Sequence, residues 1–209
     1  MGLRSKYYAN YRHPKGFFGK YVVKAMNGKR HAALAEWALD FVEIKEDDDI
    51  LDIGCGGGAN VARMLERCPK GTVNGVDFAP AAINIARMLN SKAIQSERCR
   101  IVGGNAKMLP VIKDTINLAT AFETVYYWPA FEECVAEAFR VLKSGGHFLI
   151  ANETDGIDPE GEKWAKLIGH MYLYTAEELE EALTGAGFIN VTVHHDPTTH
   201  YLCVVGQKP

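Results

Sequence analysis

One short stretch of the chain predicts a buried strand, a glycine turn and a helix start in immediate succession: Ile50-Leu51-Asp52-Ile53-Gly54-Cys55-Gly56-Gly57-Gly58-Ala59-Asn60. A Gly-x-Gly turn lets the main chain adopt positive φ and approach a ligand closely. The helix that follows offers unpaired N–H groups and its positive dipole end to an anion. The stretch therefore predicts a nucleotide pocket. Its Gly54-x-Gly56-x-x-Ala59 spacing, with Asp77 farther along, also fits a dinucleotide-binding turn.

The acid that precedes the glycines helps to distinguish between the two kinds of nucleotide. A carboxylate at Asp52 would lie near the pyrophosphate of a dinucleotide, and such like-charge repulsion costs up to several kcal/mol. An amino-acid zwitterion fits better, because its carboxylate can face the helix N-terminus while its ammonium pairs with Asp52. This arrangement describes the methionine end of S-adenosylmethionine.

Four blocks of sequence, in order along the chain, carry a resemblance to a known family. They are Leu51-Asp52-Ile53-Gly54-Cys55-Gly56-Gly57-Gly58, Val73-Asn74-Gly75-Val76-Asp77-Phe78-Ala79-Pro80, Gly104-Asn105-Ala106-Lys107-Met108-Leu109-Pro110 and Arg140-Val141-Leu142-Lys143-Ser144-Gly145-Gly146-His147-Phe148. With these blocks the chain resembles the class I S-adenosylmethionine-dependent methyltransferases, in the small-molecule branch called methyltransferase type 11. The resemblance covers most of the chain from about residue 48 onward.

Strand and helix patterns alternate along the chain, which is typical of an α/β protein with a mostly parallel sheet. Strands are expected at 50–53, 73–76, 100–102, 115–120, 147–151, 189–194 and 201–205. The clearest helices are expected at 60–67, 81–90, 132–142 and 176–185, the last with a capping box formed by Thr175 and Glu178. Together with the resemblance, this predicts a Rossmann-like seven-stranded sheet that ends in an antiparallel hairpin.

The chain is expected to form a single domain with an N-terminal helical cap. Residues 1–44 have a helical pattern, and the resemblance implies that such a segment is a lid over the cofactor cleft. Residues 45–209 are expected to form the S-adenosylmethionine-binding domain. A length of 209 residues with 47% hydrophobic and 23% charged residues suits one globular domain with a sizeable core.

Charge and apolar patterns bound the partners and the compartment. The net charge of −3 gives no reason to expect a nucleic-acid partner. No apolar run is long enough to cross a bilayer, and the N-terminus lacks the apolar core of a signal peptide. We therefore expect a cytoplasmic protein with a small-molecule methyl acceptor and no membrane partner, while the oligomeric state stays open.

No metal site is expected from the cysteines and histidines. The five cysteines are scattered singly, without a CxxC pair, which argues against zinc and against a disulfide framework. His194, His195 and His200 fall in the predicted terminal hairpin. Their spacing is not that of a metal site on a strand, because successive Cβ atoms point to opposite faces.

Most of the expected cofactor contacts follow the predicted strands, where open α/β sheets bind ligands at their carboxyl ends. Asp52 is expected to bind the ammonium group, and Asp77 either accepts hydrogen bonds from both ribose hydroxyls or caps the next helix. Phe78 could cover one face of the adenine. Asn105 stands where the family commonly has an acid facing the adenine amino group, and its neutral carbonyl can still accept. The expected cofactor-binding residues are Asp52, Gly54, Cys55, Gly56, Asp77, Phe78, Asn105, Ala106 and Phe122.

The catalytic candidates lie near the aromatic run that ends the fourth predicted strand. Glu123 could orient an acceptor amine or hydroxyl or act as a general base, or it could cap the next helix or pair with the basic N-terminal segment. Tyr126 could form a wall for the acceptor or pack beneath the lid. His31 could reach the cleft from the lid side.

In the acidic stretch 152–159, Glu153 and Asp155 could receive a cationic acceptor, and Asp158 is expected in a solvated loop.

The mechanism expected from these residues is an in-line displacement of the methyl group. Holding the nucleophile and the methyl together in a dry cleft lowers much of the barrier, and a base is needed only if the nucleophile arrives protonated. Two other classes of protein remain compatible with the sequence. One is a nicotinamide-dependent oxidoreductase, and the other is a non-catalytic protein that binds an adenosyl ligand.

Overall fold

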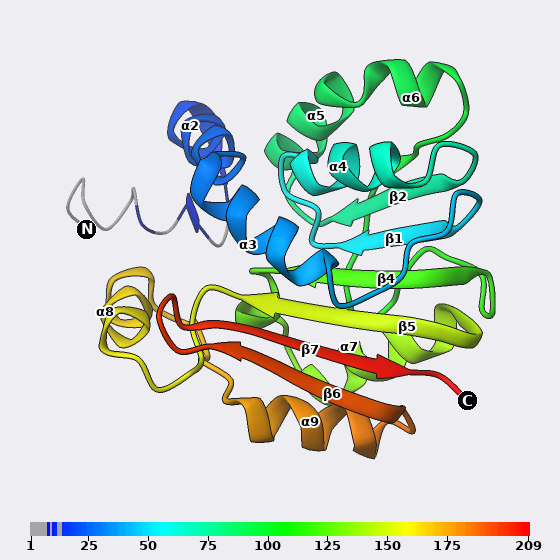
Figure 1. Ribbon diagram of the computed structural model, residues 1–209. Coiled ribbons are helices and arrows are strands. Elements are labelled where there is room, and N and C mark those ends of the chain that lie inside the picture. The colour runs from blue at the N-terminus through cyan, green and yellow to red at the C-terminus, as the bar shows by residue number, and fades with distance from the viewer. Residues whose placement is uncertain (1–7, 9, 12–13) are drawn as a thin grey trace.

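A computed structural model describes residues 8, 10, 11 and 14–209 of the chain. The remaining positions, including the first residues of the expected lid, lie outside the described residues (Figure 1). Within the described part, no helix has both the length and the apolar character needed to cross a membrane.

The centre of the molecule is a seven-stranded sheet with the order β3-β2-β1-β4-β5-β7-β6. The pairs among β1 to β5 are parallel, whereas β7 runs antiparallel to both of its neighbours. The strands are β1 (Asp49–Ile53), β2 (Thr72–Asp77), β3 (Ile101–Gly103), β4 (Ile116–Phe122), β5 (Leu142–Asn152), β6 (Ile189–Asp196) and β7 (Tyr201–Gln207). The predicted fold class, with its closing antiparallel hairpin, is therefore confirmed.

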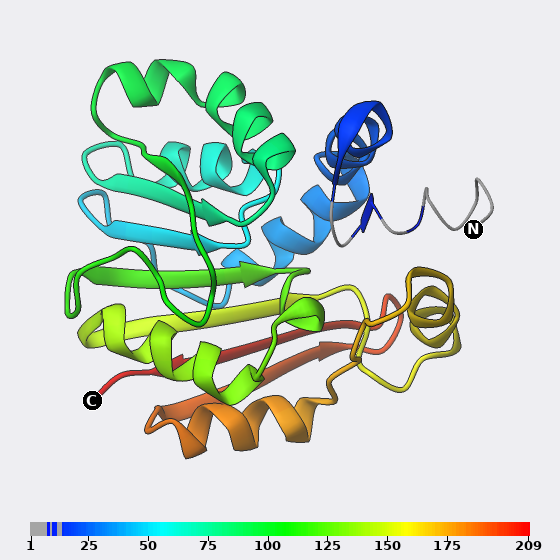
Figure 2. The same ribbon diagram turned by 180° about the vertical axis from the view of Figure 1, so that it is seen from behind.

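Helices cover both faces of this sheet, as Figures 1 and 2 show from opposite sides. The helices are α2 (Gly16–Met26), α3 (Lys29–Leu39), α4 (Ala59–Arg67), α5 (Pro80–Leu89), α6 (Ser91–Gln95), α7 (Phe131–Val141), α8 (Pro159–Ile168) and α9 (Ala176–Gly185), with a short 3₁₀ helix η1 (Val125–Tyr127). On one face Ile50 joins α3 and α4 in a core, and on the other Leu51 joins α7 and α9. Consecutive residues of β1 enter opposite cores because side chains alternate along a strand.

Local signals in the sequence account for several helix boundaries. Gly58 begins α4 with a φ of +77°, a left-handed conformation that glycine adopts without strain. Pro80 occupies the first turn of α5, where its missing N–H has no intrahelical partner to lose. The capping box predicted for α9 is present, since Thr175 and Glu178 exchange side-chain and backbone hydrogen bonds.

The acidic stretch after β5 differs from the prediction. Asp158 is buried rather than solvated, and its side chain is the N-cap of α8, where Oδ1 accepts a 2.6 Å hydrogen bond from the N–H of Gly161. The Asp-Pro sequence at 158–159 is a helix-start signal, because Asp caps well and Pro suits the first helical position. Figures 1 and 2 place α8 and α2 at the end of the sheet toward which β1, β2, β4 and β5 point.

Candidate active site

Three neighbouring cavities lie at the carboxyl ends of the parallel strands, and each is named here after one residue of its lining. The Asp52 cavity has a volume of about 60 Å³, the Asp77 cavity about 230 Å³ and the Tyr126 cavity about 550 Å³. Gly54 lines both of the first two, and Tyr127 lines the Asp77 and Tyr126 cavities. The three spaces therefore adjoin one another around the glycine turn.

All of the residues predicted to bind the cofactor or to take part in catalysis line this set of cavities, whereas Asp155 does not. The Asp52 cavity is lined by Asp52, Gly54, Cys55, Gly56 and Phe122, together with His31 and Glu123. The Asp77 cavity is lined by Asp77, Phe78, Asn105 and Ala106. The Tyr126 cavity is lined by His31, Glu123 and Tyr126. The tertiary structure thus brings the predicted cofactor residues and the predicted catalytic residues into one continuous region.

Asp52 is a buried carboxyl at the end of β1. The hydroxyl of Thr120, on the adjacent strand β4, donates a 2.9 Å hydrogen bond to its Oδ1. Burial raises the pKa of Asp52 to about 7, an effect that the Thr120 bond opposes and the charge of Asp77 reinforces. A cation bound in the cavity would favour the ionised carboxylate. The site therefore fits the ammonium group of an amino-acid ligand.

At Gly54 the glycine turn lies too close to its neighbours for a side chain. Gly54 has a φ of +79°, and a Cβ atom built there would lie 2.1 Å from the hydroxyl oxygen of Thr124. The N–H of Gly54 donates to the carbonyl of Val76 at 2.7 Å, which ties the turn to β2. At Gly56 a Cβ would meet nothing within 4 Å, since that residue borders open space. The turn thus forms an uncovered main-chain surface of the kind that lets a ligand lie close.

Asp77, at the end of β2, has a carboxyl group that is already partly hydrogen-bonded. Its Oδ2 accepts from the N–H of Gly56 at 2.9 Å, and its Oδ1 accepts from the N–H of Ala79 at 2.8 Å. Burial nevertheless raises the pKa of Asp77 above its ordinary value. Because a carboxylate oxygen accepts more than one hydrogen bond, both oxygens keep capacity for a ligand hydroxyl.

The far side of the Asp77 cavity is more open. Phe78 lines this cavity and is 47% exposed. The side-chain oxygen of Asn105 accepts a 3.0 Å hydrogen bond from the N–H of Lys107. This local turn holds the Asn105 oxygen that was expected to face an adenine amino group. A carbonyl oxygen accepts two hydrogen bonds, so one acceptor position is left for such a ligand.

Glu123 joins the other two catalytic candidates in a cluster where the Asp52 and Tyr126 cavities meet. The hydroxyl of Tyr126 donates to its Oε1 at 2.8 Å, and the N–H of Glu153 donates to the same oxygen. His31 Nδ1 lies 3.1 Å from Oε1 of Glu153. The 3₁₀ helix η1 that follows Glu123 has no side-chain cap. Part of the basic N-terminal segment that the sequence offered as a partner of Glu123 lies outside the described residues.

The chemistry of this cluster is set by burial and by two neighbouring carboxyl groups. Burial, followed by the charge of Glu153, raises the pKa of Glu123 to about 7, and His31 acts in the opposite direction. Burial also raises the pKa of Tyr126 well above its ordinary value, so its hydroxyl stays protonated and donates. A carboxyl that titrates near neutral pH is suited to accept a proton from a bound substrate.

Several lining residues were not singled out by the sequence. Asn27 and Asn60 line the Asp52 cavity, and Asn27 donates a 3.2 Å hydrogen bond from its side chain to the carbonyl of Gly57. Trp164 of α8 lines the Tyr126 cavity. The Asn27-Gly28 pair between two helical patterns is a recognisable turn signal, whereas nothing in the local sequence directs Trp164 to this cavity.

Two groups of side chains among the described residues could hold a metal ion, although the sequence predicted none. One is the cluster of His31, Glu123 and Glu153, and the other consists of Asp155, His195 and His200. In each group the potential ligand atoms lie within 4.8 Å of one another. The first group belongs to the site described above, and the second lies at the end of the β6–β7 hairpin.

The fold is that of an open α/β sheet with cavities at the carboxyl ends of its strands, beside the topological switch point between β1 and β4. Comparison with known proteins agrees, since residues 51–150 match a family described as a methyltransferase domain. Residues 51–150 of the chain are therefore a methyltransferase domain, and S-adenosylmethionine is the cofactor of this domain.

Similar proteins include two sterol methyltransferases. The chain is 32% identical to 24-methylenesterol C-methyltransferase 2 of Arabidopsis thaliana over 114 residues, which is 54% of this chain and 31% of that protein. It is 28% identical to sterol 4-C-methyltransferase strm-1 of Caenorhabditis elegans over 178 residues, which is 81% of this chain and 51% of that protein. The chain thus spans between about a third and a half of the length of these relatives.

Solved structures support the fold. A methyltransferase in complex with the Trm112 activator of Haloferax volcanii has a TM-score of 0.80 at 22% identity, covering 91% of this chain and 94% of that chain. A SAM-dependent methyltransferase from Aquifex aeolicus has a TM-score of 0.76 at 18% identity, covering 91% and 98%. At these identities the likeness concerns the arrangement of strands and helices.

Proposed function

We propose that this chain transfers the methyl group of S-adenosylmethionine to a small-molecule acceptor that reaches the site with a protonated nucleophile. The observation that carries the proposal is the position of Glu123. This carboxyl, with a pKa near 7, lines both the Asp52 cavity and the Tyr126 cavity. It thus borders the space that fits the amino-acid end of the cofactor and the larger space beside it.

The cofactor would occupy the Asp52 and Asp77 cavities. Asp52 would hold its ammonium group, Asp77 its ribose hydroxyls, and Phe78 one face of its adenine. When bound, the cofactor supplies a methyl group on a sulfonium, which a nucleophile displaces in line. Phe122 and the turn at Gly54 would exclude water on the methionine side, since both line the Asp52 cavity.

The acceptor would occupy the Tyr126 cavity. Its lining combines aromatic and aliphatic side chains, among them Tyr127, Trp164, Ile168 and Met171, with the carboxyl groups at its inner end. This composition suits an acceptor with an apolar body and a polar reacting end. The naming of two relatives as sterol methyltransferases supports a small apolar acceptor as well.

The catalytic candidates would activate and orient this acceptor. Glu123 would accept the proton that the nucleophile releases, while the Tyr126 hydroxyl and the Glu153 N–H hold its carboxylate in place. His31, 3.1 Å from Glu153, would stabilise the negative charge of the Glu123 and Glu153 carboxylates.

Because His31 belongs to α3, we also propose that residues 1–44 act as the lid of the acceptor cavity and 45–209 as the cofactor domain.

Calorimetry with S-adenosylmethionine and S-adenosylhomocysteine tests the first half of the proposal. We expect both ligands to bind the purified chain and Asp77→Ala to weaken binding by at least about tenfold, since charge-assisted hydrogen bonds contribute about 1.5–3 kcal/mol. Glu66→Gln, an exposed acid of α4, is the control and should bind like the unchanged chain. Absence of binding, or binding of NADH in its place, would contradict the proposal.

Transfer of a labelled methyl group to a metabolite extract tests the second half. We expect label in a small organic-soluble product and none when the cofactor is replaced by S-adenosylhomocysteine. Binding without transfer to any metabolite pool would instead favour a non-catalytic protein that binds the adenosyl ligand.

A further inference from the structure

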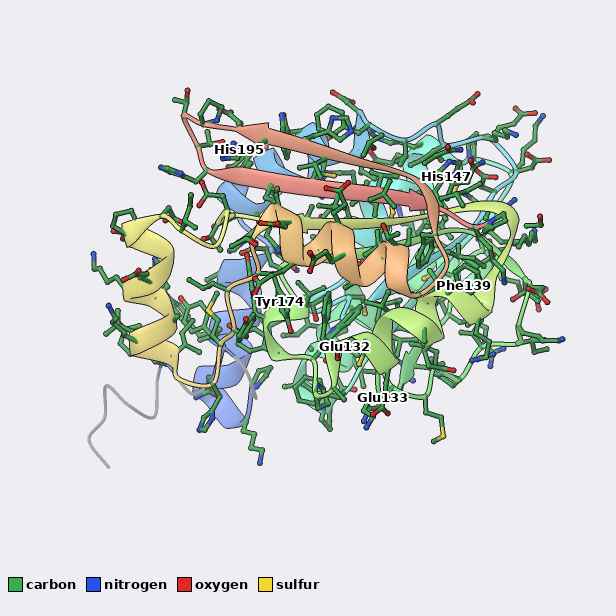
Figure 3. The ribbon with its side chains drawn as sticks, turned by 90° about the horizontal axis from the view of Figure 1, so that it is seen from below. Glu132, Glu133, Phe139, His147, Tyr174 and His195 are labelled. Carbon is green, nitrogen blue, oxygen red and sulfur yellow. The ribbon has the colours of Figure 1, made fainter. Side chains whose placement is uncertain are left out.

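The tip of the β6–β7 hairpin carries a group of side chains that the proposed methyl transfer does not use. His195 is the penultimate residue of β6, and His200 immediately precedes β7. Figure 3 shows His195 at the end of the hairpin that lies toward α8. Asp155 comes from the segment between β5 and α8, so three separate parts of the chain meet here.

A single carboxylate oxygen lies between the two imidazole rings. Oδ2 of Asp155 is 3.1 Å from Nε2 of His195 and 2.9 Å from Nδ1 of His200. The side chain of Asp155 is only 8% exposed, whereas those of the histidines are 40% and 43% exposed. The group is therefore anchored on its acidic side and reachable from solvent on the other.

The other oxygen of Asp155 is held by the main chain. Oδ1 accepts hydrogen bonds from the N–H of Ile157 at 3.1 Å and of Asp158 at 3.0 Å. These bonds fix the orientation of the carboxylate and leave Oδ2 directed at the two rings. Metal-binding carboxylates are commonly oriented by such hydrogen bonds to the oxygen that does not bind the metal.

The spacing suits a tetrahedral metal ion. With Zn–N and Zn–O distances of about 2.0–2.1 Å, ligand atoms around a tetrahedral zinc ion are roughly 3.3 Å apart. The two separations of 3.1 and 2.9 Å fall a few tenths of an ångström short of this value, and all three ligand atoms lie within 4.8 Å of one another. Small side-chain rotations would therefore open the group around an ion.

We propose that Asp155, His195 and His200 form a binding site for a divalent transition-metal ion of the zinc type. Two neutral imidazoles and one carboxylate are ligands that Zn²⁺ prefers, and three protein ligands leave a fourth position for water or an anionic ligand group. His200 also lines the Tyr126 cavity, so the ion would lie beside the proposed acceptor space. The ion would tie the hairpin to the segment that begins α8.

Titration of the metal-free full-length chain with ZnCl₂, followed by calorimetry, tests this site. We expect one high-affinity ion per chain, and at least about a tenfold weaker affinity in both His195→Ala and His200→Ala. Asp155→Asn keeps an oxygen for the two N–H groups but removes the anionic ligand, so it should also weaken binding. The spectrum of bound Co²⁺ should report the same losses.

His194→Ala is the matched control. His194 neighbours His195 in the same strand, but its ring stacks on Phe41 at a centroid distance of 3.8 Å, away from the group. This variant should keep the zinc affinity, and zinc should raise the melting temperature of the unchanged chain and of His194→Ala but not of His200→Ala.

Three results would overturn the proposal. They are zinc binding no tighter than about 1 mM, equal affinity in the unchanged chain and in His195→Ala and His200→Ala, and loss of affinity in His31→Ala alone. The last result would assign the ion to the cluster of His31, Glu123 and Glu153. Circular dichroism of each variant separates loss of the site from loss of the fold.

Discussion

Two carboxyl groups of the site, Asp52 and Glu123, have pKa values raised to about 7 for partly different reasons. For both groups burial is the largest cause, but the secondary charge is that of Asp77 for Asp52 and that of Glu153 for Glu123. In the proposed function a cation binds to the first carboxyl, and a proton is transferred to the second. The same chemical group thus performs two tasks because its surroundings differ.

The binding of S-adenosylmethionine should depend on pH through Asp52. Below pH 7 the ammonium group must displace a proton from this carboxyl, so we expect the affinity to rise by up to about tenfold per pH unit toward pH 7 and then to level off. Calorimetry in two buffers with different ionisation enthalpies measures the released proton. Asp52→Asn should bind more weakly and release no proton, and the same release from that variant would contradict the assignment.

Replacement of Glu123 should affect catalysis more than cofactor binding. Glu123→Gln keeps an oxygen for Tyr126 and for the N–H of Glu153 but cannot accept the proton, so kcat should fall by about 10²–10⁴. In the unchanged chain kcat should rise with pH through about 7, because the carboxylate is the active form. Full activity of Glu123→Gln would show that Glu123 is not the base. Glu66→Gln is the control and should keep the kcat of the unchanged chain.

At the scale of elements, the turn from β1 to α4 positions the cofactor site through backbone conformation. Gly54 is held at a positive φ directly against Thr124, which precedes η1. Strand β1 is an interior strand of the sheet, so its carboxyl end adjoins β2 on one side and β4 on the other. The turn consequently sets the distance between the glycines and the residues that follow β4.

Gly54→Ala should destabilise the chain and abolish cofactor binding. The matched control is Gly145→Ala, since Gly145 has a nearly equal φ of +78° but a Cβ there would meet nothing within 4 Å. The control should lose about 1–2 kcal/mol from left-handed strain alone, whereas Gly54→Ala adds a clash with Thr124. Urea unfolding and calorimetry with S-adenosylhomocysteine measure both effects, and equal losses in the two variants would count against the close approach.

Elements with strong local signals could be predicted from the sequence, and those that depend on distant contacts could not. The capping box of α9 and the apolar run of β1 each lie within a few residues, so their signals are complete in the local sequence. Helix α8 was missed although Asp158-Pro159 is a local start signal, because its acidic start also resembles a solvated loop. Asp158 is buried there by packing that brings α8 to the Tyr126 cavity.

At the scale of the whole molecule, the helices that precede the sheet are part of the core. Leu34, Ala38 and Leu39 of α3 are buried with residues of β1, α4 and β5. Helix α2 packs against α5, where Val23 joins Ala79 and Ala82. The proposed lid is therefore anchored at its α3 end, which keeps His31 beside the cavities.

The stability of the ligand-free protein should reflect the burial of Asp52. Because the pKa of this carboxyl is higher in the folded than in the unfolded state, its contribution to the free energy of unfolding decreases as pH rises from about 4 to about 7. Asp52→Asn removes the cost of a buried charge, so this variant should be more stable than the unchanged chain at pH 8. At pH 5 the difference in stability between the two proteins should be smaller, because Asp52 is then protonated in the folded state.

Urea unfolding at the two pH values measures this difference. Comparing the two proteins cancels the contributions of His147 and His194, whose lowered pKa values have the opposite effect on the pH dependence. If the difference in the free energy of unfolding between the two proteins did not change with pH, the pKa of Asp52 would not be raised by burial. We expect Asp52→Asn to gain stability and to lose cofactor binding, because a buried charge that serves function lowers the stability of the folded protein.

The sequence alone determined the fold class, the glycine turn and the acids at the carboxyl ends of β1 and β2. These features are local, and the carboxyl ends of parallel strands meet at one edge of a sheet, so Asp52, Gly54 and Asp77 could be placed together without coordinates. Their lining of two adjoining cavities agrees with that placement.

Only the tertiary structure decided which side chains form the two clusters of acids and histidines. Glu123 and Glu153 are 30 residues apart, and Asp155 is 40 and 45 residues from His195 and His200. Strand alternation correctly separates His194 from His195, but it says nothing of a carboxylate that approaches from the end of another strand. Contacts at such sequence separations, and the burial that raises the pKa of Glu123, arise only when the strands have been brought side by side.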